Sequence, residues 1–320
     1  MKPKERKLYN EQRKNDFLEC KVADSLHPSY ISIFSMFTAT ETKLEKDLCE
    51  LSLKDVQRVL DKEINSTKNS SFTFYKSCLT KYVEWCKENN YPVTDSVFKA
   101  DYSPTVDRIR FRMVASPLHL QKRLDEYLEP VEEESSDCIL RCFIWLAFSG
   151  LKKEEAILVK TEDVDLVNFR IYFDNRSYPI YSEAIPVFRV VCNATHFKYT
   201  NPNYASHLKV QMRERCSSEY LLRGIKTAAP TAASLCNYIN KKNDKSNWFV
   251  YDGIRMSGVF YRAYEDERCG IKDVIDSIVM KEKVGLGAGK KHDKNYQKLF
   301  NNQKSRVRAD YNDWKNAFSS

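Results

Sequence analysis

Cationic side chains are the residues whose number and spacing give this chain its clearest chemistry. The 320 residues include 52 Lys and Arg against 44 Asp and Glu, a formal net charge of +8. The excess is uneven, because residues 281–315 hold ten Lys and Arg and four Asp and Glu, a surplus of six. Such clusters neutralise phosphate oxygens, so the pattern favours an anionic partner such as nucleic acid. A solvated basic face explains each cluster equally well when it is considered alone.

A glycine-rich segment within this stretch superficially resembles a phosphate-binding loop. Three glycines in residues 285–289 are followed by Lys290 and Lys291. However, Val284 stands where the first glycine of such a loop belongs, and Lys291 stands where a Ser or Thr would hold magnesium. We therefore interpret the segment as a hinge. Lys290 and Lys291 are candidate DNA contacts if the segment folds against a duplex.

The sequence predicts neither a metal site nor a cofactor. The ten cysteines form no CxxC pair, and the five histidines form no HExxH motif. Cys138 and Cys142 lie among apolar residues at helical spacing, so we expect reduced thiols in a hydrophobic core. The chain has no apolar run of about 18 residues, and residues 1–15 lack the apolar core of a signal peptide. We expect a cytoplasmic protein without a membrane partner.

The length predicts two domains with separate hydrophobic cores. Residues 1–27 are polar and basic, which is typical of an N-terminal arm. Residues 28–112 predict a small helical domain, with helices over Tyr30–Phe37, Ser52–Leu60 and Phe72–Lys87, the second of them capped by Ser52. Residues 113–320 form the second domain, which ends in basic helices. Arg108, Arg110 and Arg112 alternate with apolar residues, a spacing that favours a strand.

The second domain begins with a helix over 118–128 and contains the most informative segment of the chain. An apolar helix from Cys138 ends at Gly150, which is a typical C-cap residue, and a strand begins near Phe169. A turn at 174–177 predicts a hairpin. Residues 196–204 favour a loop, and residues 208–224 favour a helix that carries Lys209 and Arg213. A short helix follows over 231–239. The fold class is mainly α with a small antiparallel β-sheet.

This order of elements resembles the tyrosine recombinases, or phage integrases. In that family a helix ends in a Thr-Gly-Leu-Arg turn, and here residues 149–152 are Ser-Gly-Leu-Lys. The helical domain at 28–112 is similar to the family's core-binding (SAM-like) domain, and residues 113–320 are similar to its catalytic domain. The resemblance covers residues 28–310 and is firmest over 138–173. It implies a two-domain protein that clasps double-stranded DNA.

The resemblance also implies which residues would face the scissile phosphate. Lys152 occupies the place of the first catalytic arginine, and Arg176 is the cation nearest to the hairpin lysine. The family's His-x-x-Arg motif corresponds to Asp252 and Arg255. Tyr296 best matches the spacing of the nucleophile. Tyr311 is the alternative nucleophile, and neither His nor Trp occurs at the downstream position near 279–280.

These departures predict a protein that binds DNA but does not cut it. Phosphoryl transfer needs cations that clamp the nonbridging oxygens and a donor for the leaving oxygen, and each lost donor costs about 2.7–4 kcal/mol. Lys152 lacks the bidentate fork of arginine, and the carboxylate of Asp252 would repel phosphate. Arg176, with a pKa above about 12, is a poor proton donor. The sequence therefore indicates no enzyme, and the predicted DNA contacts are Lys152, Arg176, Lys209, Arg213, Arg255, Lys290 and Lys291.

Among members of the family, the chain is most similar to degenerate, integrase-like repressors of phage lytic genes, which maintain lysogeny. The resemblance implies operator-like DNA as partner, a protein or peptide antirepressor as a further candidate, and association with the bacterial nucleoid. It also implies that residues 295–318 dock in cis or in trans, the latter giving a homo-oligomer. Two alternatives stay open. One is an active recombinase with Tyr296 as nucleophile, and the other is a protein-interaction module on the same scaffold.

Overall fold

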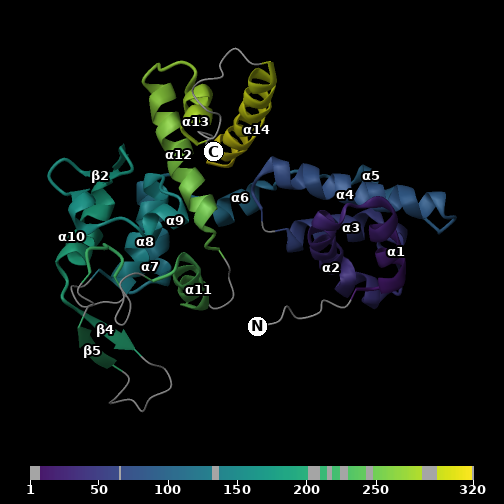
Figure 1. Cartoon of the computed structure of the whole chain (residues 1–320), viewed down its shortest axis with the longest axis horizontal. Helices are drawn as coiled ribbons and strands as arrows, with labels where there is room; N and C mark the ends of the chain where they lie inside the picture. Colours follow the sequence, from purple (N-terminus) through teal and green to yellow (C-terminus); the bar gives the residue numbers. More distant parts are fainter. Residues whose placement is uncertain are drawn as a thin grey trace. The chain divides into compact units, whose positions relative to one another are not determined.

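The computed structural model describes residues 8–64, 66–131, 137–200, 210–214, 218–223, 230–242, 248–282 and 294–318. The chain divides into two compact units, Met1–Val106 and Asp107–Ser320. Helices dominate the elements of both units (Figure 1). None of the helices in these ranges is both long and apolar enough to cross a membrane. The boundary lies inside α6 (Val106–Arg112), whereas the sequence placed it after residue 112.

Unit 1 is helical, as the sequence predicted. Ser52 caps α3 by accepting a hydrogen bond from the Asp55 amide at 3.3 Å, which satisfies a backbone donor of the first turn. The segment between α2 and α3 contains a short 3-10 helix. The elements in chain order are α1 (Glu11–Lys21), η1 (Asp24–Leu26), α2 (His27–Leu44), η2 (Leu48–Glu50), α3 (Leu53–Glu63), α4 (Asn69–Glu88) and α5 (Ser96–Lys99).

Helix α1 belongs to the core of unit 1, which differs from the separate N-terminal arm that the sequence predicted. Phe17 is fully buried, and its ring centroid lies 5.3 Å from that of Tyr82 and 5.7 Å from that of Trp85, both on α4. Leu18 is buried beside it. The polar composition of residues 8–27 hid these two apolar residues, and their burial supplies the free energy that holds α1 in place.

A buried ion pair joins α1 to α2. The ammonium group of Lys14 donates to both carboxylate oxygens of Glu41 at 2.6 and 2.7 Å, and both side chains have no exposed surface. Glu41 also accepts from the Leu48 amide at 2.8 Å, and Lys14 donates to the Tyr9 carbonyl at 2.8 Å. Burial raises the pKa of Glu41 to about 7, although the charge of Lys14 acts in the opposite direction. The two charges are therefore paired and hydrogen-bonded throughout, as buried charges require.

Asp47, Cys49 and Cys86 place three potential metal ligands within 4.8 Å of one another in the core of unit 1. The carboxylate of Asp47 already accepts hydrogen bonds from Tyr82 at 2.9 Å and from Asn10 at 3.0 Å. The guanidinium of Arg13 lies 3.5 Å from the same carboxylate. Arg13 thus supplies the positive charge that balances the Asp47 carboxylate. The group is a network of hydrogen bonds and one ion pair inside the core of unit 1. The nine cysteines of the described residues carry free thiols, seven of them buried or half-buried.

Unit 2 is organised around α8, the apolar helix that the sequence identified. Twelve of its thirteen residues are buried, including Trp145 and Phe148. The other elements are α7 (Pro117–Tyr127), α9 (Lys153–Ala156), η3 (Thr161–Asp163), β1 (Val164–Asp165), β2 (Arg170–Phe173), β3 (Arg176–Pro179), η4 (Ser182–Ala184), α10 (Ile185–Asn193), β4 (His196–Thr200), β5 (Val210–Glu214), α11 (Ala232–Lys242), α12 (Tyr251–Arg268), α13 (Val274–Glu282) and α14 (Lys294–Phe318), with α8 at Asp137–Ser149. The predicted helices over 118–128 and 231–239 correspond to α7 and α11.

Helix α12 packs against α8 so closely that one position must be glycine. A Cβ atom at Gly258 would lie 1.7 Å from the carbonyl oxygen of Phe148. Such an approach brings the two backbones into direct contact, which no larger residue allows. The hydroxyl of Ser257 donates to the Gly253 carbonyl at 2.8 Å and accepts from the Val114 amide at 3.0 Å, which ties α12 to the segment after α6.

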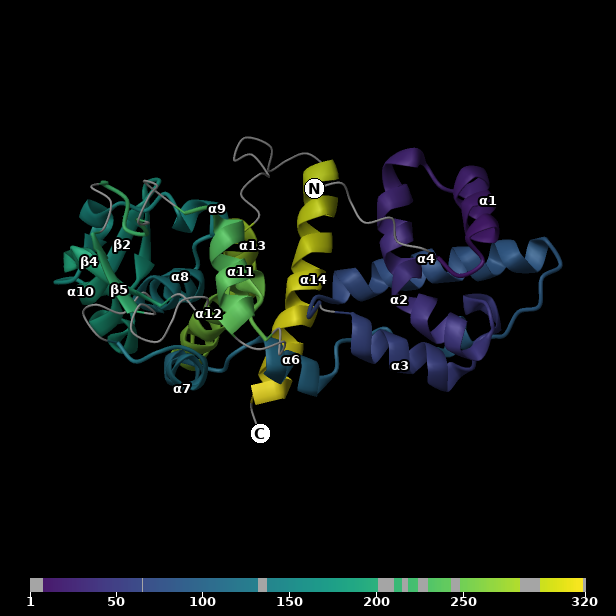
Figure 2. The ribbon, with the colours of Figure 1, turned by 90° about the horizontal axis from the view of Figure 1, so that it is seen from below.

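The long C-terminal helix α14 lies along α12 and α13 of its own chain, with α6 beside its C-terminal end (Figure 2). Val307, Tyr311 and Trp314 are buried there. The indole of Trp314 donates to the Val114 carbonyl at 3.0 Å, and the guanidinium of Arg110 donates to the Ala317 carbonyl at 2.7 Å. The apolar face of α14 is therefore covered in cis, which is one of the two arrangements expected from the sequence.

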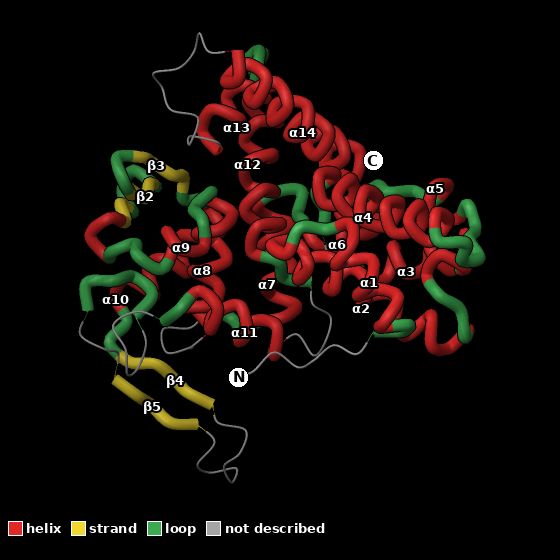
Figure 3. The backbone as a smooth tube through the Cα atoms, turned by 45° about the vertical axis from the view of Figure 1, so that its right-hand side comes forward, coloured by secondary structure: helices red, strands yellow, loops and turns green. Residues whose placement is uncertain are grey.

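Two antiparallel sheets lie apart from each other in unit 2 (Figure 3). The larger has the order β1-β2-β3 and is the small sheet that the sequence predicted. The smaller pairs β4 with β5, so the predicted loop was wrong over 196–200 and the predicted helix was wrong over 210–214, whereas residues 201–209, 215–217 and 224 of these predictions lie outside the described residues. Aromatic and polar residues alternate along β4, and apolar and polar residues alternate along β5. This two-residue period is too short to outweigh the surrounding composition in a sequence, but pairing of the two strands satisfies both backbones.

The strand predicted around residues 108–113 was also wrong, because this segment forms helix α6. Arg108 and Arg112 are both 9% exposed, and Ile109 and Met113 are buried. Residues four apart share one face of a helix, so the buried set has helical spacing. The long apolar stems of Arg108 and Arg112 let them lie on this buried face. Because arginines were counted as polar in the sequence, the helical period of the buried residues was read as an alternation of polar and apolar residues.

Replacement of Lys14 by Met should destabilise unit 1 by about 3–5 kcal/mol, because it leaves the Glu41 carboxylate buried without a compensating positive charge. Adding Glu41→Leu to Lys14→Met should restore most of that loss, since an apolar pair needs no compensating charge. Urea unfolding of the full chain, followed through the backbone amide resonances of unit 1, measures both changes.

The matched control is Lys21→Met, which removes the exposed Lys21–Glu88 pair at 2.9 Å. That change should cost less than about 1 kcal/mol. Equal losses for Lys14→Met and Lys21→Met would show that the buried pair does not hold α1 to α2.

Candidate functional site: a cationic pocket

The turn after α8 positions the first of the predicted site residues. Gly150 has φ +115, and its amide donates to the Ala147 carbonyl at 2.8 Å. The next amide, of Leu151, donates to the Leu146 carbonyl at 3.2 Å. These two bonds form the Schellman arrangement that ends many helices at a glycine. The predicted C-cap at Gly150 is therefore confirmed, and it delivers Lys152 to the start of α9.

Lys152 is partly tied to the first turn of α9. Its backbone amide donates to the Glu155 carboxylate at 2.8 Å, and its ammonium group lies 3.8 Å from the same side chain. The side chain of Lys152 is 53% exposed, so the cation stays accessible to a ligand. At this distance and exposure the ion pair contributes little to stability.

A tight hairpin presents Arg176. Asp174 and Asn175 both have positive φ, 48° and 57°, so β2 and β3 are joined by a two-residue turn in which Phe173 pairs with Arg176. Asn and Asp tolerate this conformation better than most residues. A hydrogen bond with the Tyr178 phenol raises the pKa of the Arg176 guanidinium. Arg176 is thus a permanent cation, as the sequence indicated.

The first turns of α12 carry Asp252 and Arg255, the pair predicted from the His-x-x-Arg comparison. Arg255 is largely buried, with its side chain 10% exposed, and its Nε lies 3.7 Å from the Asp252 carboxylate. Asp252 is 53% exposed at the helix start. The phenol of Tyr251 donates to the Leu151 carbonyl at 3.1 Å. This bond connects the start of α12 to the turn that carries Lys152.

These elements enclose one pocket of about 570 Å³. It brings together three of the predicted contacts, which lie more than 20 residues apart in the sequence. The charged residues that line it are Lys152, Glu155, Arg170, Arg176, Arg255 and Arg262. Five cations minus one carboxylate give a formal charge of +4. Asp252 is not among the lining residues, so the carboxylate expected to oppose a phosphate does not form the pocket wall.

Arg170 and Arg262 are pocket residues that the sequence analysis missed. Arg170 opens β2, directly after the residue where a strand was predicted. Arg262 follows Arg255 by seven residues, or about two helical turns, so the two share a face of α12. This seven-residue spacing is the sequence signal from which Arg262 could have been predicted. Arg262 donates to the Phe148 carbonyl at 3.1 Å and to the Tyr181 phenol at 3.2 Å, which holds its guanidinium beside the Gly150 turn.

The two tyrosines considered as nucleophiles differ in how far the structure describes them. Tyr311 is 2% exposed and stacks on Trp314, and its phenol donates to the Glu267 carboxylate at 2.8 Å. Burial, together with the nearby Glu267 carboxylate, raises its pKa well above the usual range. Tyr311 is therefore a packing residue. Tyr296 lies in the first turn of α14, but its side chain is outside the described residues.

The other predicted DNA contacts are not among the residues that line the pocket. Lys209, Lys290 and Lys291 lie outside the described residues, as does the side chain of Arg213, whose backbone is in β5. The downstream position that holds His or Trp in the resembled family falls on α13. There Val279 is buried and Met280 is 44% exposed.

The geometry of the pocket suits an oxyanion. Arginine forks can donate two parallel hydrogen bonds to a phosphate, and lysine adds a point charge. The cations come from a helix-capping turn, a hairpin and a helix, so their spacing is set by packed elements. The described residues of the pocket wall include no histidine, the side chain that most often passes a proton to a leaving oxygen near neutral pH. The arrangement can bind and orient phosphate.

Solved structures of integrases and recombinases match most of this chain. A lambda integrase (residues 75–356) bound to DNA matches with 12% identity over 82% of this chain and 88% of that chain, with a TM-score of 0.37. XerA recombinase matches with 12% identity over 91% and 98%, with a TM-score of 0.33. The Tn1549 transposon integrase in complex with circular intermediate DNA matches with 13% identity over 91% and 95%, with a TM-score of 0.37.

Comparison with protein families is more specific for unit 1. Residues 8–88 match the family described as "MrpR, N-terminal core-binding domain". The match starts before α1 and ends at the last residue of α4, so it includes the helix that the sequence had assigned to an arm. No curated protein matches the chain. The chain is thus mainly helical with a small three-stranded sheet, and its first unit is similar to the core-binding domain of MrpR.

Replacement of Gly150 by Ala should both strain the turn and displace a pocket cation. An L-residue at φ +115 costs about 1–3 kcal/mol, and the new Cβ would lie 2.8 Å from Nη2 of Arg262. The chain offers a matched control in Gly270→Ala, because Gly270 has φ +82 but a Cβ there would meet no atom within 4 Å.

Urea unfolding of both variants separates the two effects. Both should lose stability through backbone strain, and Gly150→Ala should lose more because Arg262 must move. An equal loss in the two variants would show that Gly150 serves only the backbone conformation and does not shape the pocket.

Proposed function

We propose that the chain binds double-stranded DNA at operator-like sequences and represses phage lytic genes without cutting the DNA. The observation that carries the proposal is the pocket in which Lys152, Arg176 and Arg255 meet Arg170 and Arg262. Its formal charge of +4 suits the phosphate backbone, which supplies much of the affinity of DNA-binding proteins. Phosphate contacts also fix the register in which other elements contact the bases.

The match of unit 1 to a core-binding domain supports the same proposal. In the resembled recombinases this domain clasps DNA opposite the catalytic domain. The chain also resembles the integrase-like master repressor of lysogeny of SPβ-type Bacillus phages, whose function is to keep a prophage silent. On this proposal the protein acts on the nucleoid of a bacterial host. A protein or peptide antirepressor stays a prediction, and so does a homo-oligomer, although the apolar face of α14 is covered in cis and would not supply its interface.

Three features of the pocket and its surroundings support binding in place of strand transfer. Lys152 provides one donor direction where a guanidinium fork would clamp two oxygens. Arg176 has its pKa raised further by Tyr178 and so retains its proton. The side chains of Val279 and Met280 carry no N–H donor where His or Trp would donate. Since each missing donor costs about 10²–10³ in rate, their combination favours a protein that holds DNA.

Replacement of Lys152 by Gln should weaken binding to every duplex by a similar factor and should lower the salt dependence. One lost phosphate contact reduces the slope of log K against log salt by about 0.9. Arg255→Gln should act in the same direction. Fluorescence anisotropy on fragments selected from the source genome, titrated from about 50 to 200 mM salt, measures the slopes.

The matched control is Arg268→Gln, which removes an arginine from the other end of α12, where the side chain is 65% exposed and pairs with Glu265. Its slope should equal that of the unaltered protein. If Lys152→Gln and Arg255→Gln also leave the slope unchanged, the pocket does not contact DNA, and a protein-interaction module becomes the better account.

The selected fragments should leave the protein completely under denaturation. A recombinase would instead retain a covalent 3′-phosphotyrosyl adduct, and Tyr296→Phe would abolish it. Denaturing gels run beside native gels distinguish the two. An adduct that depends on Tyr296 would establish strand cleavage and overturn the noncatalytic part of the proposal.

A further inference from the structure

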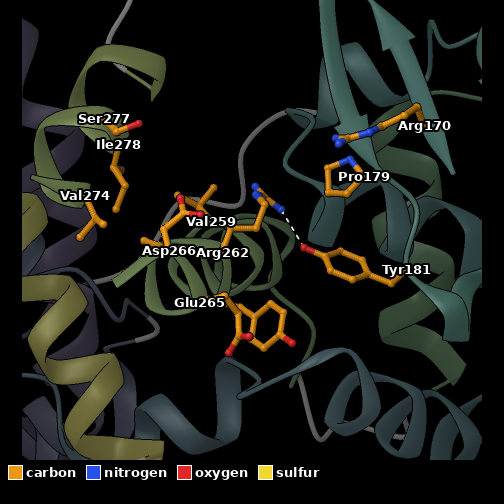
Figure 4. Close-up of a pocket in the computed structure, with 12 residues that line it drawn as sticks. Arg170, Pro179, Tyr181, Val259, Arg262, Glu265, Asp266, Val274, Ser277 and Ile278 are labelled. Atoms are coloured by element: carbon orange, nitrogen blue, oxygen red, sulfur yellow. Dashed lines mark hydrogen bonds between the residues drawn. The ribbon is translucent and has the colours of Figure 1, made fainter. Parts of the chain in front are cut away.

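A second pocket of about 530 Å³ adjoins the cationic pocket, between the β2–β3 hairpin on one side and α12 and α13 on the other. Arg170, Pro179 and Arg262 line both pockets. Figure 4 shows Arg262 projecting from α12 toward Tyr181, with Arg170 on the strand side. The volume lies within the range of about 300–1,000 Å³ that small-molecule sites occupy.

The charges of the second pocket are divided between opposite signs. Arg170 and Arg262 supply two cations, whereas Glu265 and Asp266 on α12 supply two carboxylates, of which Glu265 already lies 3.3 Å from the Arg268 guanidinium. Within the described ranges, the side chains of Arg170 and Asp266 form neither a hydrogen bond nor an ion pair. Opposite charges on rigid neighbouring elements that do not pair with each other can both be met by one ligand that carries both signs.

The surface between the charges is partly apolar. Val259, Val274 and Ile278 are 7%, 8% and 5% exposed. The rings of Tyr181 and Tyr261 lie nearby, with centroids 6.1 Å apart. A ligand that fits this surface has a short apolar body. A strand of nucleic acid does not fit, because the two carboxylates would repel its phosphates.

We propose that this second pocket binds a small zwitterion of the amino-acid or short-peptide class. Its carboxylate pairs with Arg170 and Arg262, its ammonium group pairs with Asp266, and its apolar side chain packs against Val259 and Ile278. Bidentate pairing with arginine and a charge-assisted bond to a carboxylate fix the orientation of such a ligand. Recognition of the carboxylate alone or of the ammonium group alone would not distinguish the zwitterion from simple anions or amines.

The shared arginines link this ligand to the cationic pocket. A carboxylate bound to Arg170 and Arg262 neutralises two of the five cations, so it lowers the affinity of that pocket for phosphate. By linkage, phosphate lowers the affinity for the zwitterion by the same factor. This effect on DNA rests on the proposed function, whereas binding of the zwitterion does not.

The direct test titrates the full chain with leucine, dileucine and trileucine, which carry the two charges at increasing separation. Shifts of the backbone amide resonances of residues 259–266 and 274–278 report binding. At least one probe should bind with a Kd of about 1 mM or tighter. Its N-acetylated form and its C-amidated form should each bind more than about tenfold more weakly, because each lacks one charge.

Asp266→Asn and Arg170→Gln should weaken the same probe to a similar degree, and both positions are exposed enough for the fold to be retained. The control is Glu154→Gln, which changes an acidic side chain of 70% exposure that lines neither pocket. Absence of binding by all three probes, or equal binding by the blocked forms, would overturn the proposal.

A second measurement adds the best probe to the complex with a selected DNA fragment. Release of the DNA with unaltered protein, and no release with Asp266→Asn, is the expected result for the link between the pockets. If the probe binds and the DNA stays bound, the link is wrong. If no DNA fragment binds at all, the proposed function fails while the amide titration still decides the zwitterion site.

Discussion

The backbone contact between α8 and α12 is the constraint on which the cationic pocket depends. Gly258 has no side chain, so α12 can lie directly against the Phe148 carbonyl at the end of α8. The same carbonyl accepts from Arg262 one turn further along α12. Because α8 ends there in the Gly150 turn, the contact sets the distance between Lys152 and the arginines of α12. A larger residue at 258 would separate the two helices and open the pocket.

The concentration of positive charge in the cationic pocket follows from the packing of α8 against α12. Five cations gather around the turn, the hairpin and α12, and the single carboxylate of the pocket wall, Glu155, offsets only part of their mutual repulsion. The elements hold them together because apolar residues of α8 and α12 supply the compensating free energy. A pocket whose lining residues carry a formal charge of +4 favours an anionic ligand, which is why it supports the proposed phosphate-binding role better than a purely structural one.

Unit 1 illustrates a different use of charge. Lys14 and Glu41 are buried, and the network around Asp47 includes Arg13 and two hydrogen-bond donors. These groups are satisfied internally and leave no charge for a ligand. They fix the positions of α1 and α2 within the domain that matches MrpR. These buried charges of unit 1 thus specify packing, whereas the cations of unit 2 line a pocket.

The sequence by itself determined the elements whose signals are local. The apolar period of α8, the Gly150 C-cap, the Ser52 N-cap and the hairpin at 174–175 were all predicted, because each depends on a few adjacent residues. Lys152 and Arg255 were also named from motif positions, and Arg176 was named as the cation nearest to the hairpin turn. The structure decided that they line one pocket, that Arg170 and Arg262 join them, and that Asp252 does not. It also decided that residues 106–112 are helical, that β4 pairs with β5, and that α1 and α14 pack in their own units. These outcomes depend on contacts between residues distant in the sequence, where burial and strand pairing outweigh local preference.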